Sequence, residues 1–110
     1  MTTERMQQKL DDCPALVTIK AISGKWKTRI LWLLRTEPKH FGELKRNLTG
    51  VSAKMLTEHL RQLEQDGLIY RKVTSQNNIQ LTEYGYTPYG ETLIPVLDGM
   101  GNWGLKHSDR

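Results

Sequence analysis

The sequence predicts a mostly helical α+β fold in which four short helices precede a two-stranded hairpin and a terminal helix. Apolar residues recur at helical spacing in five segments, and a run rich in β-forming residues surrounds a polar tip between residues 68 and 87. Turn signals built from Gly, Pro or Asn separate these segments. The chain has 110 residues, the length of one domain, so we expect a single domain over residues 1–110.

The first two helices are bounded by proline and glycine. Cys13-Pro14 favours a helix start, because proline in the first turn loses no needed hydrogen bond, and Ser23-Gly24 supplies a glycine that ends a helix. Residues 25–36 are predicted to form the second helix, which Glu37-Pro38 ends. Its buried stripe consists of Trp26, Ile30, Leu33 and Leu34.

The next two helices are expected over residues 41–48 and 53–65. Ser52 can cap the second of them, because its side-chain oxygen can accept from an unpaired amide of the first turn, and Asp66-Gly67 ends that helix. Leucines at i, i+4 and i+7 give it an inward face made of Leu56, Leu60 and Leu63. The opposite face is polar and consists of Lys54, Glu58, Arg61 and Gln65, with Thr57 and Gln62 beside them.

Residues 68–74 and 79–87 are predicted strands, joined by the turn-prone tip Ser75-Gln76-Asn77-Asn78. Thr87-Pro88 then starts a long terminal helix with apolar residues at helical spacing. This helix contains three glycines that each cost about 1 kcal/mol relative to alanine, namely Gly99, Gly101 and Gly104. We expect the helix either to fray after Leu97 or to pack closely against another helix.

Two short helices joined by a tight turn and followed by a hairpin are typical of a winged helix-turn-helix with a two-stranded wing. The lean apolar content leaves surface for a partner, so we expect the helices near residues 13–24 and 88–105 to form a dimer. The expected seam residues are Leu16, Leu93, Val96, Leu97, Met100 and Trp103. The alternative is that the terminal helix only covers the core of its own chain.

The charge of the chain is unevenly placed. The net charge is +4, but residues 20–72 carry +7 and the two ends together carry −3. A basic middle within a neutral-to-acidic frame is expected when one face of a protein meets a polyanion such as a nucleic acid. The alternative is a solvated basic surface, which many proteins have.

Several function classes find no support in the sequence. Its charge-free runs are far shorter than the ~20 apolar residues that cross a bilayer, and residues 1–10 are too polar for a secretory signal, so we expect a cytoplasmic protein. His40, His59 and His107 lack metal-ligand spacing, which favours packed or capping roles. The sequence contains no phosphate-binding glycine loop or nucleophile elbow, so we expect neither an enzyme nor a cofactor.

An ordered set of short motifs runs through nearly the whole chain. In order, the motifs are Cys13-Pro14, Gly24-Lys25-Trp26, Phe41-Gly42-Glu43-Leu44, residues 52–57, residues 60–64, Asp66-Gly67-Leu68-Ile69, Glu83-Tyr84, Thr87-Pro88-Tyr89-Gly90 and Trp103-Gly104. The set resembles the HxlR family of bacterial winged-helix regulators, within the broader MarR-like group. The resemblance implies a homodimeric, sequence-specific DNA-binding transcription factor, often a repressor of detoxification or redox genes.

The helix over residues 53–65 spans about 20 Å, a suitable length for the major groove. Arg61 can donate two hydrogen bonds to guanine, Glu58 can accept from cytosine, and Thr57 offers a methyl to thymine or a hydroxyl to a base edge or phosphate. Ser52 and Lys54, at the helix start, are better placed for phosphate. The alternative is that Lys54, Glu58 and Arg61 form an ion-pair ladder on a solvated face, worth only about 0.2 to 0.5 kcal/mol per pair.

Further basic residues are expected to attract the DNA backbone. They are Lys25, Lys27, Lys39, Lys45 and Arg46 in the helical part, and Arg71 and Lys72 where the wing approaches the phosphates. Six phosphate contacts would give a slope of log K against log salt of about −5. The family's wing is usually proline-rich with an arginine before the Glu-Tyr pair, whereas Leu81 lies near that place here. Asn77 and Asn78 either touch the minor groove or serve only the turn geometry.

Cys13 is the candidate regulatory residue. The positive end of a helix dipole favours the thiolate at a helix N-terminus, and relatives in the family use a cysteine at this place to sense oxidants or electrophiles. Modification of Cys13, or a Cys13 to Cys13 bridge between subunits, would change dimer geometry and DNA affinity. The alternative is a small buried apolar residue, as free cysteine usually is.

Two further functions compete with a dimeric operator-binding regulator of double-stranded DNA. One is a protein- or RNA-interaction winged helix that uses the same basic face. The other is a small-ligand-binding protein, which needs a pocket among aromatic residues that are more often core. Those residues are Trp26, Trp32, Tyr86, Tyr89 and Trp103.

Overall fold

The structure is a computed structural model that describes residues 13–108. The helices in this range are α2 (Pro14–Ile22), α3 (Lys25–Leu34), α4 (Phe41–Asn47), α5 (Ala53–Gln65), α6 (Pro88–Glu91) and α7 (Ile94–His107). The strands are β1 (Lys39–His40), β2 (Ile69–Gln76) and β3 (Ile79–Tyr86). The order α4, α5 and then a β2–β3 hairpin confirms the predicted winged helix-turn-helix.

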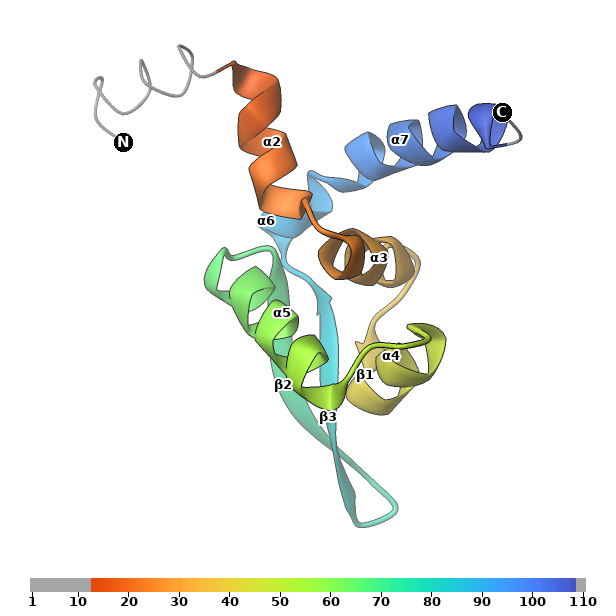
Figure 1. The fold of residues 1–110 in the computed structure, drawn as a ribbon. Helices are drawn as coiled ribbons and strands as arrows, with labels where there is room; N and C mark the ends of the chain where they lie inside the picture. The colour runs from red at the N-terminus through yellow and green to blue at the C-terminus, as the bar shows by residue number, and fades with distance from the viewer. Residues whose placement is uncertain (1–12, 109–110) are drawn as a thin grey trace, which may run out of the picture.

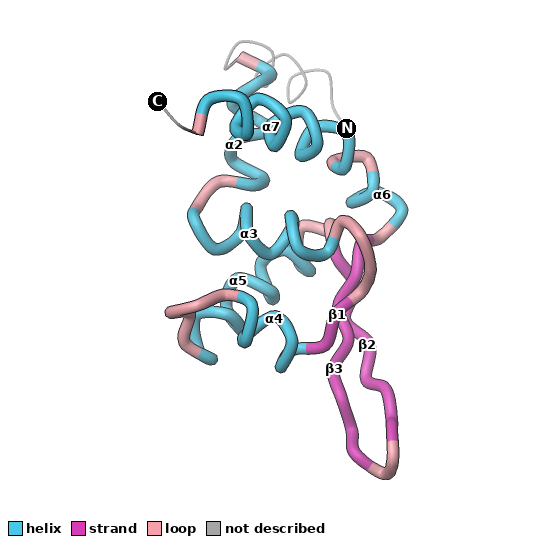
Figure 2. Tube along the Cα trace, turned by 90° about the vertical axis from the view of Figure 1, so that its right-hand side faces the viewer, coloured by secondary structure: helices cyan, strands magenta, loops and turns pink. Residues whose placement is uncertain are grey.

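The terminal helices and the hairpin lie at opposite ends of the molecule. Figures 1 and 2 show α2 and α7 at one end, α3 next to them, and α4 and α5 on the far side of α3. The hairpin projects beyond the helices at the other end (Figure 1). No helix within residues 13–108 is long and apolar enough to cross a membrane. The secretory-signal expectation concerns residues 1–10, which lie outside the described residues.

The core lies between α3, α5 and the sheet. Leu56, Leu60 and Leu63 of α5 are at most 1% exposed, which confirms the inward face that their spacing predicts. They belong to one buried cluster with residues of α3 and of the sheet region, which include Ile30, Leu31, Leu34, Leu68, Ile69 and Tyr84. The inner face of α5 is therefore fixed by packing, and its polar face is left pointing outward.

Both predicted ends of α5 are present. Ser52 Oγ accepts a hydrogen bond from the Met55 N–H at 3.0 Å, and Gly67 follows the helix with φ +77°. The left-handed conformation at Gly67 suits a residue without a Cβ, and it ends the helix directly before β2. Local residues thus determine where α5 begins and ends.

We expect Ser52→Ala to lower the free energy of unfolding by about 1 kcal/mol, because the Met55 N–H loses its acceptor. Urea denaturation followed by circular dichroism measures the change. Ser52→Asp keeps an acceptor at this place and should remain close to the wild type. An equal loss in both variants would argue against a capping role.

The sheet has one more strand than the sequence predicts. β1 pairs antiparallel with β3, which lies between β1 and β2. The prediction of a four-residue tip is also wrong. Ser75 pairs with Gln80 and Gln76 pairs with Ile79, so only two residues form the turn. Those two residues, Asn77 and Asn78, have φ of +54° and +65°. Two successive left-handed residues form the turn that matches the twist of a hairpin, and asparagine tolerates this conformation.

The single terminal helix predicted from Thr87-Pro88 is two helices in the structure. α6 ends at Glu91, and α7 starts at Ile94 with Pro95 in its first turn. Within one continuous helix, the proline ring would clash with the carbonyl of Glu91 four residues earlier, so the helix restarts. The second helix, α3, ends at Leu34 rather than at residue 36.

α7 does not fray after Leu97 but continues to His107. Gly101 lies against Trp32 of α3 so closely that a Cβ would overlap the indole ring. Trp32 is in turn covered by Arg35, whose guanidinium lies 3.5 Å from the ring centroid. Arg35 Nε also donates to Asp98 Oδ1 of α7 at 3.3 Å. Close packing against another helix, one of the two expected outcomes, therefore holds at Gly101.

Candidate nucleic-acid interface

The outer face of α5 is exposed and polar. Lys54, Thr57, Glu58, Arg61 and Gln65 are all exposed, as the helical spacing predicts. Within residues 13–108 the ion pairs are Arg35–Asp98, Lys39–Glu37 and His40–Glu43, and none joins Lys54, Glu58 and Arg61. The ion-pair ladder is therefore not formed, and these charged groups remain available for another molecule.

Two hydroxyl groups near the start of α5 are already used by the helix. Ser52 Oγ accepts from the Met55 N–H, and Thr57 Oγ1 donates to the Ala53 carbonyl at 2.8 Å. The Ser52 hydroxyl keeps its proton for an external acceptor, whereas the Thr57 hydroxyl proton is occupied. Thr57 therefore presents chiefly its methyl group, one of the two contacts expected for it.

A cleft of about 430 Å³ separates α5 from the hairpin. It brings together three predicted site residues, Thr57 and Arg61 from α5 and Arg71 from β2. Its remaining lining residues are Phe41, Glu64 and Tyr84. The sequence places Arg61 and Arg71 on different elements and carries no signal that they share a cleft, because that depends on how α5 crosses the sheet.

The strand register separates the two basic residues of the wing. Arg71 pairs with Tyr84 and Lys72 pairs with Glu83 on β3. Because successive residues of a strand point to opposite faces, Arg71 and Lys72 lie on opposite faces of the sheet. The wing therefore presents Arg71 alone of this pair toward the cleft beside α5.

Three of the lysines expected to attract the DNA backbone differ in their surroundings. Lys27 is only 7% exposed, so its predicted contribution to the phosphate-facing surface is wrong. The side chain of Lys39 is 12% exposed and its Nζ lies 3.5 Å from Glu37 Oε1, which leaves little of it free. Lys25 is exposed at the start of α3, with its Nζ 4.7 Å from the centroid of the Trp26 ring.

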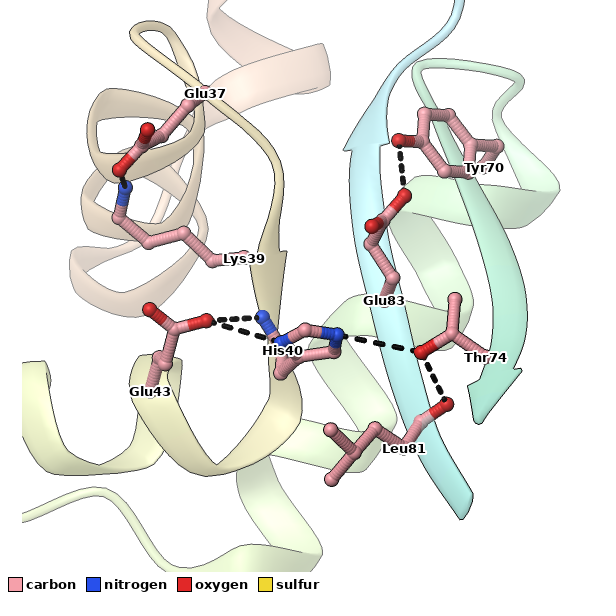
Figure 3. A network of polar contacts seen from close by, with 8 residues as sticks. All are labelled: Glu37, Lys39, His40, Glu43, Tyr70, Thr74, Leu81 and Glu83. Atoms are coloured by element: carbon pink, nitrogen blue, oxygen red, sulfur yellow. Dashed lines mark hydrogen bonds and ion pairs between the residues drawn. The ribbon is translucent and has the colours of Figure 1, made fainter. Parts of the chain in front are cut away.

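A polar network joins the start of α4 to the wing (Figure 3). His40 caps α4: its backbone N–H donates to Glu43 Oε1 at 2.9 Å, and its Nδ1 lies 3.2 Å from the same oxygen. The N–H of His40 holds the pKa of Glu43 below its usual value. On the other side of the ring, Nε2 lies 3.4 Å from Thr74 Oγ1 of β2, which donates to the Leu81 carbonyl of β3.

A second contact stiffens the same face of the hairpin. The Tyr70 hydroxyl donates to Glu83 Oε2 at 2.7 Å (Figure 3). Burial, together with this hydrogen bond, raises the pKa of Tyr70 to about 12. The Tyr70 ring lies over Gly85, where a Cβ would overlap it.

The structure gives His40 a capping role, which agrees with the expectation of packed or capping histidines. Glu43 three residues after His40 is a sequence signal for such a cap. Its contact with Thr74 has no such signal, because the two residues are far apart in the chain. His40 therefore supports the wing, a role that sequence reasoning misses.

Cys13 is exposed at the N-terminal end of α2, directly before Pro14. The alternative of a buried apolar cysteine is therefore wrong within this chain. Its backbone has φ +68°, which few residues other than glycine adopt. The thiol is open to reagents from solution.

Most residues predicted for the dimer seam are exposed. Leu16, Val96, Met100 and Trp103 are between 40% and 66% exposed. Leu93 is half-buried against the core, and Leu97 is 1% exposed within it. The seam prediction for Leu97 is therefore wrong, because its side chain fills the interior of its own chain.

A second, larger cleft of about 610 Å³ lies between α3, α7 and the turn after α4. Of the five aromatic residues considered for a ligand pocket, Trp32 alone lines it. Tyr86 instead donates a hydrogen bond to the Leu31 carbonyl, and Trp103 stacks on His107 at 3.9 Å between ring centroids. The aromatic pocket that a small-ligand-binding function would need is therefore not assembled. No group of three metal-ligating side chains gathers within residues 13–108.

Known proteins are similar to this chain in sequence and in fold. The regulator YdeP of Bacillus subtilis (strain 168) is 40% identical over 100 residues, which cover 91% of this chain and 77% of YdeP. The structure of the redox regulator HypR in its reduced form superposes with a TM-score of 0.81 at 35% identity, covering 87% of this chain and 94% of HypR. A MarR-family regulator from Enterococcus faecalis V583 superposes with a TM-score of 0.76 at 32% identity, covering 89% of this chain and 88% of its own.

Residues 21–110 match the family of HxlR-like helix-turn-helix proteins. The relatives are transcriptional regulators, so this chain is a DNA-binding regulator and not an enzyme. The motifs that suggest the HxlR resemblance, the winged helix-turn-helix and the match over most of the chain agree. The chain therefore belongs to the HxlR-like helix-turn-helix family, within the MarR-like group of regulators.

Proposed function

We propose that this chain is a homodimeric, cytoplasmic repressor that reads a pseudo-palindromic DNA operator and responds to oxidants or electrophiles through Cys13. The observation that carries the DNA-reading part is the exposed outer face of α5, which lies beside the hairpin and whose charged groups form no ion pair within residues 13–108. A major groove about 12 Å wide admits such a helix. Because the inner leucines fix α5, this face is presented in one orientation.

Several groups on and near this face have a part in the proposal. Glu58 accepts from a cytosine amino group, and the Thr57 methyl contacts a thymine methyl. Ser52 and Lys54, at the N-terminus of α5, contact phosphate. In the wing, Lys72 contributes general attraction to the backbone, and exposed Asn77 and Asn78 reach the adjacent minor groove.

Footprinting on the DNA upstream of the protein's own gene tests the proposal. We expect two protected half-sites about one helical turn apart, with binding that survives an excess of competitor DNA. Glu58→Ala should relax specificity at one base position, whereas Gln62→Ala, at the edge of the same face, serves as the matched control. Binding of RNA or of a protein without any protected DNA site would favour the interaction-module alternative and overturn the operator proposal.

We propose that α2 and α7 form the dimer seam. Both helices lie at the end of the molecule opposite the hairpin (Figure 1). They also expose large apolar side chains. These are Leu16 and Ile19 on α2, and Val96, Met100, Trp103 and Leu105 on α7. Clustered apolar exposure of this kind marks an association surface, and a two-fold dimer places the two α5 helices on one side of the DNA.

The exposed thiol of Cys13 supports the redox part of the proposal, as does the likeness to HypR, a redox regulator. With a quinone, the Cys13 thiolate adds to a ring carbon, and the ring takes up a proton to become the hydroquinone thioether. With diamide, two Cys13 thiols from paired subunits lose two protons and two electrons to form a disulfide, while the N=N bond is reduced to a hydrazine. Either change lies at the N-terminal end of α2, one of the two helices of the proposed seam.

We expect diamide or a quinone to lower the DNA affinity of the wild type at least about tenfold, the scale of a typical allosteric coupling. Cys13→Ser should bind DNA normally and lose this response. Mobility-shift titrations with and without the reagent measure both affinities, and non-reducing electrophoresis detects a cross-linked dimer. Identical responses of the two proteins would refute the sensing role of Cys13.

A further inference from the structure

The cleft between α5 and the hairpin has the chemistry of an anion site. Arg61 of α5 and Arg71 of β2 line it from two sides, and neither forms an ion pair within the described residues. Arginine presents a planar group of N–H donors whose geometry matches phosphate oxygens. Two such groups facing one cleft repel each other unless an anion lies between them.

Buried residues fix the backbone positions of the two arginines. Tyr84, which pairs with Arg71 across the strands, is 6% exposed and forms part of the lining with Phe41. Arg61 directly follows Leu60, which is 1% exposed on the inner face of α5, so the backbone of Arg61 is fixed by the core. The cleft is therefore a fixed feature of the fold, formed where the helix crosses the sheet.

The position of the cleft indicates which anion it takes. When α5 lies in a major groove and the hairpin reaches the neighbouring minor groove, the sugar-phosphate backbone that separates the grooves must pass between them. The cleft lies in this space, between α5 and β2. A backbone phosphate is thus the anion brought closest to both arginines.

We propose that Arg61 and Arg71 together hold one DNA backbone phosphate in each half-site. This inference rests on the proposed function, and it assigns Arg61 to the backbone in place of the guanine edge that its helix position suggests. Phosphate contacts set the register of a protein on DNA, so the pair fixes the depth and angle of α5 in the groove. Base recognition then falls to Glu58 and Thr57.

Glu64 lines the same cleft, and its substitution should change DNA affinity in the direction opposite to substitution of either arginine. Its carboxylate repels a phosphate that enters between the arginines, so it weakens the contact. Glu64→Gln removes this repulsion and should strengthen DNA binding several-fold. Arg61→Gln and Arg71→Gln should each weaken binding about tenfold to a hundredfold, the scale of a charge-assisted hydrogen bond.

The test uses a duplex that the wild-type protein selects from random-sequence DNA. Single phosphates of this duplex are replaced in turn by uncharged methylphosphonates, and affinities are measured for the wild type and each variant. We expect one position per half-site at which the methylphosphonate lowers the affinity of the wild type. At the same position it should lower the already reduced affinities of Arg61→Gln and Arg71→Gln little further. Arg46→Gln, on α4 and outside the cleft, is the matched control: it removes another charge expected to attract the backbone, so it should lower the overall affinity but keep the full methylphosphonate effect at this position.

The outcomes separate the inference from the proposed function. If the wild type selects no duplex, the proposed function fails. If it selects one but no phosphate is coupled to both arginines, or if 7-deazaguanine abolishes the effect of Arg61→Gln, the function stands and the phosphate site is refuted. The inference is also overturned if the free protein binds inorganic phosphate, both arginine variants lose this binding, and no phosphate position of the DNA is coupled to the two arginines. Unchanged melting temperatures establish that the variants fold.

Discussion

Leu60→Ala is expected to lower the free energy of unfolding by about 2 to 5 kcal/mol, the largest stability effect that we predict. Leu60 is 1% exposed at the centre of the inner face of α5, where it packs with residues of α3 and the sheet. Truncation removes buried methyl groups and leaves a cavity that the rigid surroundings cannot fill. Small domains are stable by only about 5 to 15 kcal/mol, so this loss is a large fraction of the total.

Urea denaturation at one fixed protein concentration measures this change, because association would make the midpoint depend on concentration. Gln62→Ala is the matched control: Gln62 is exposed on the same helix, and its loss should change stability by less than about 0.5 kcal/mol. Equal midpoints for Leu60→Ala and the wild type would show that the described core is not the one that holds α5.

Trp103→Glu is expected to convert the protein to a monomer and to lower its affinity for a two-half-site duplex by at least about a hundredfold. Trp103 is 66% exposed on α7, beside other exposed apolar residues of the proposed seam. A carboxylate buried in the seam would lose its hydration without gaining a partner, which opposes association. Once the subunits separate, the second half-site no longer benefits from the binding of the first.

Sedimentation velocity measures the oligomeric state, and mobility shift measures the affinity. Asn102→Glu introduces the same charge at the exposed neighbouring position of α7 and serves as the control for charge alone. We expect it to remain dimeric, with a modest loss of affinity from added repulsion of DNA. A dimeric Trp103→Glu protein with normal DNA affinity would place the seam elsewhere.

α5 is the element that the sequence predicts best, and its bounds are the same in the prediction and the structure. Its start depends on Ser52, its end on Gly67 and its inner face on the leucine spacing, all of which lie within a few residues of the helix. The hairpin strands are likewise predicted from local residue types. Local signals of this kind are sufficient where packing reinforces them.

The features that the sequence does not predict depend on distant partners. β1 has two residues and exists as a strand only because β3 lies beside it. The break between α6 and α7 is an exception, because it follows from Pro95, a local signal that the prediction of one terminal helix did not use. The two-residue turn at Asn77 and Asn78 depends on pairing that extends to Gln76 and Ile79.

The candidate site likewise has features that local residues predict and features that depend on packing elsewhere in the chain. The exposed polar face of α5 follows from helical spacing, and the structure presents it as predicted. The shared cleft of Arg61 and Arg71 follows from the crossing of α5 over the sheet, and the burial of Lys27 and the pairing of Lys39 follow from neighbours elsewhere in the chain. Charge counted along the sequence therefore overstates the basic surface that the fold presents.

Two contacts join α3 to α7: that of Trp32 with Gly101, and that of Arg35 with Asp98. α7 cannot slide along α3 without pulling the guanidinium from both the indole ring and the carboxylate. Because α3 also packs against α5, it lies between the C-terminal helix and the DNA-facing helix. We therefore expect a change in the packing of α7 to reach α5 through α3.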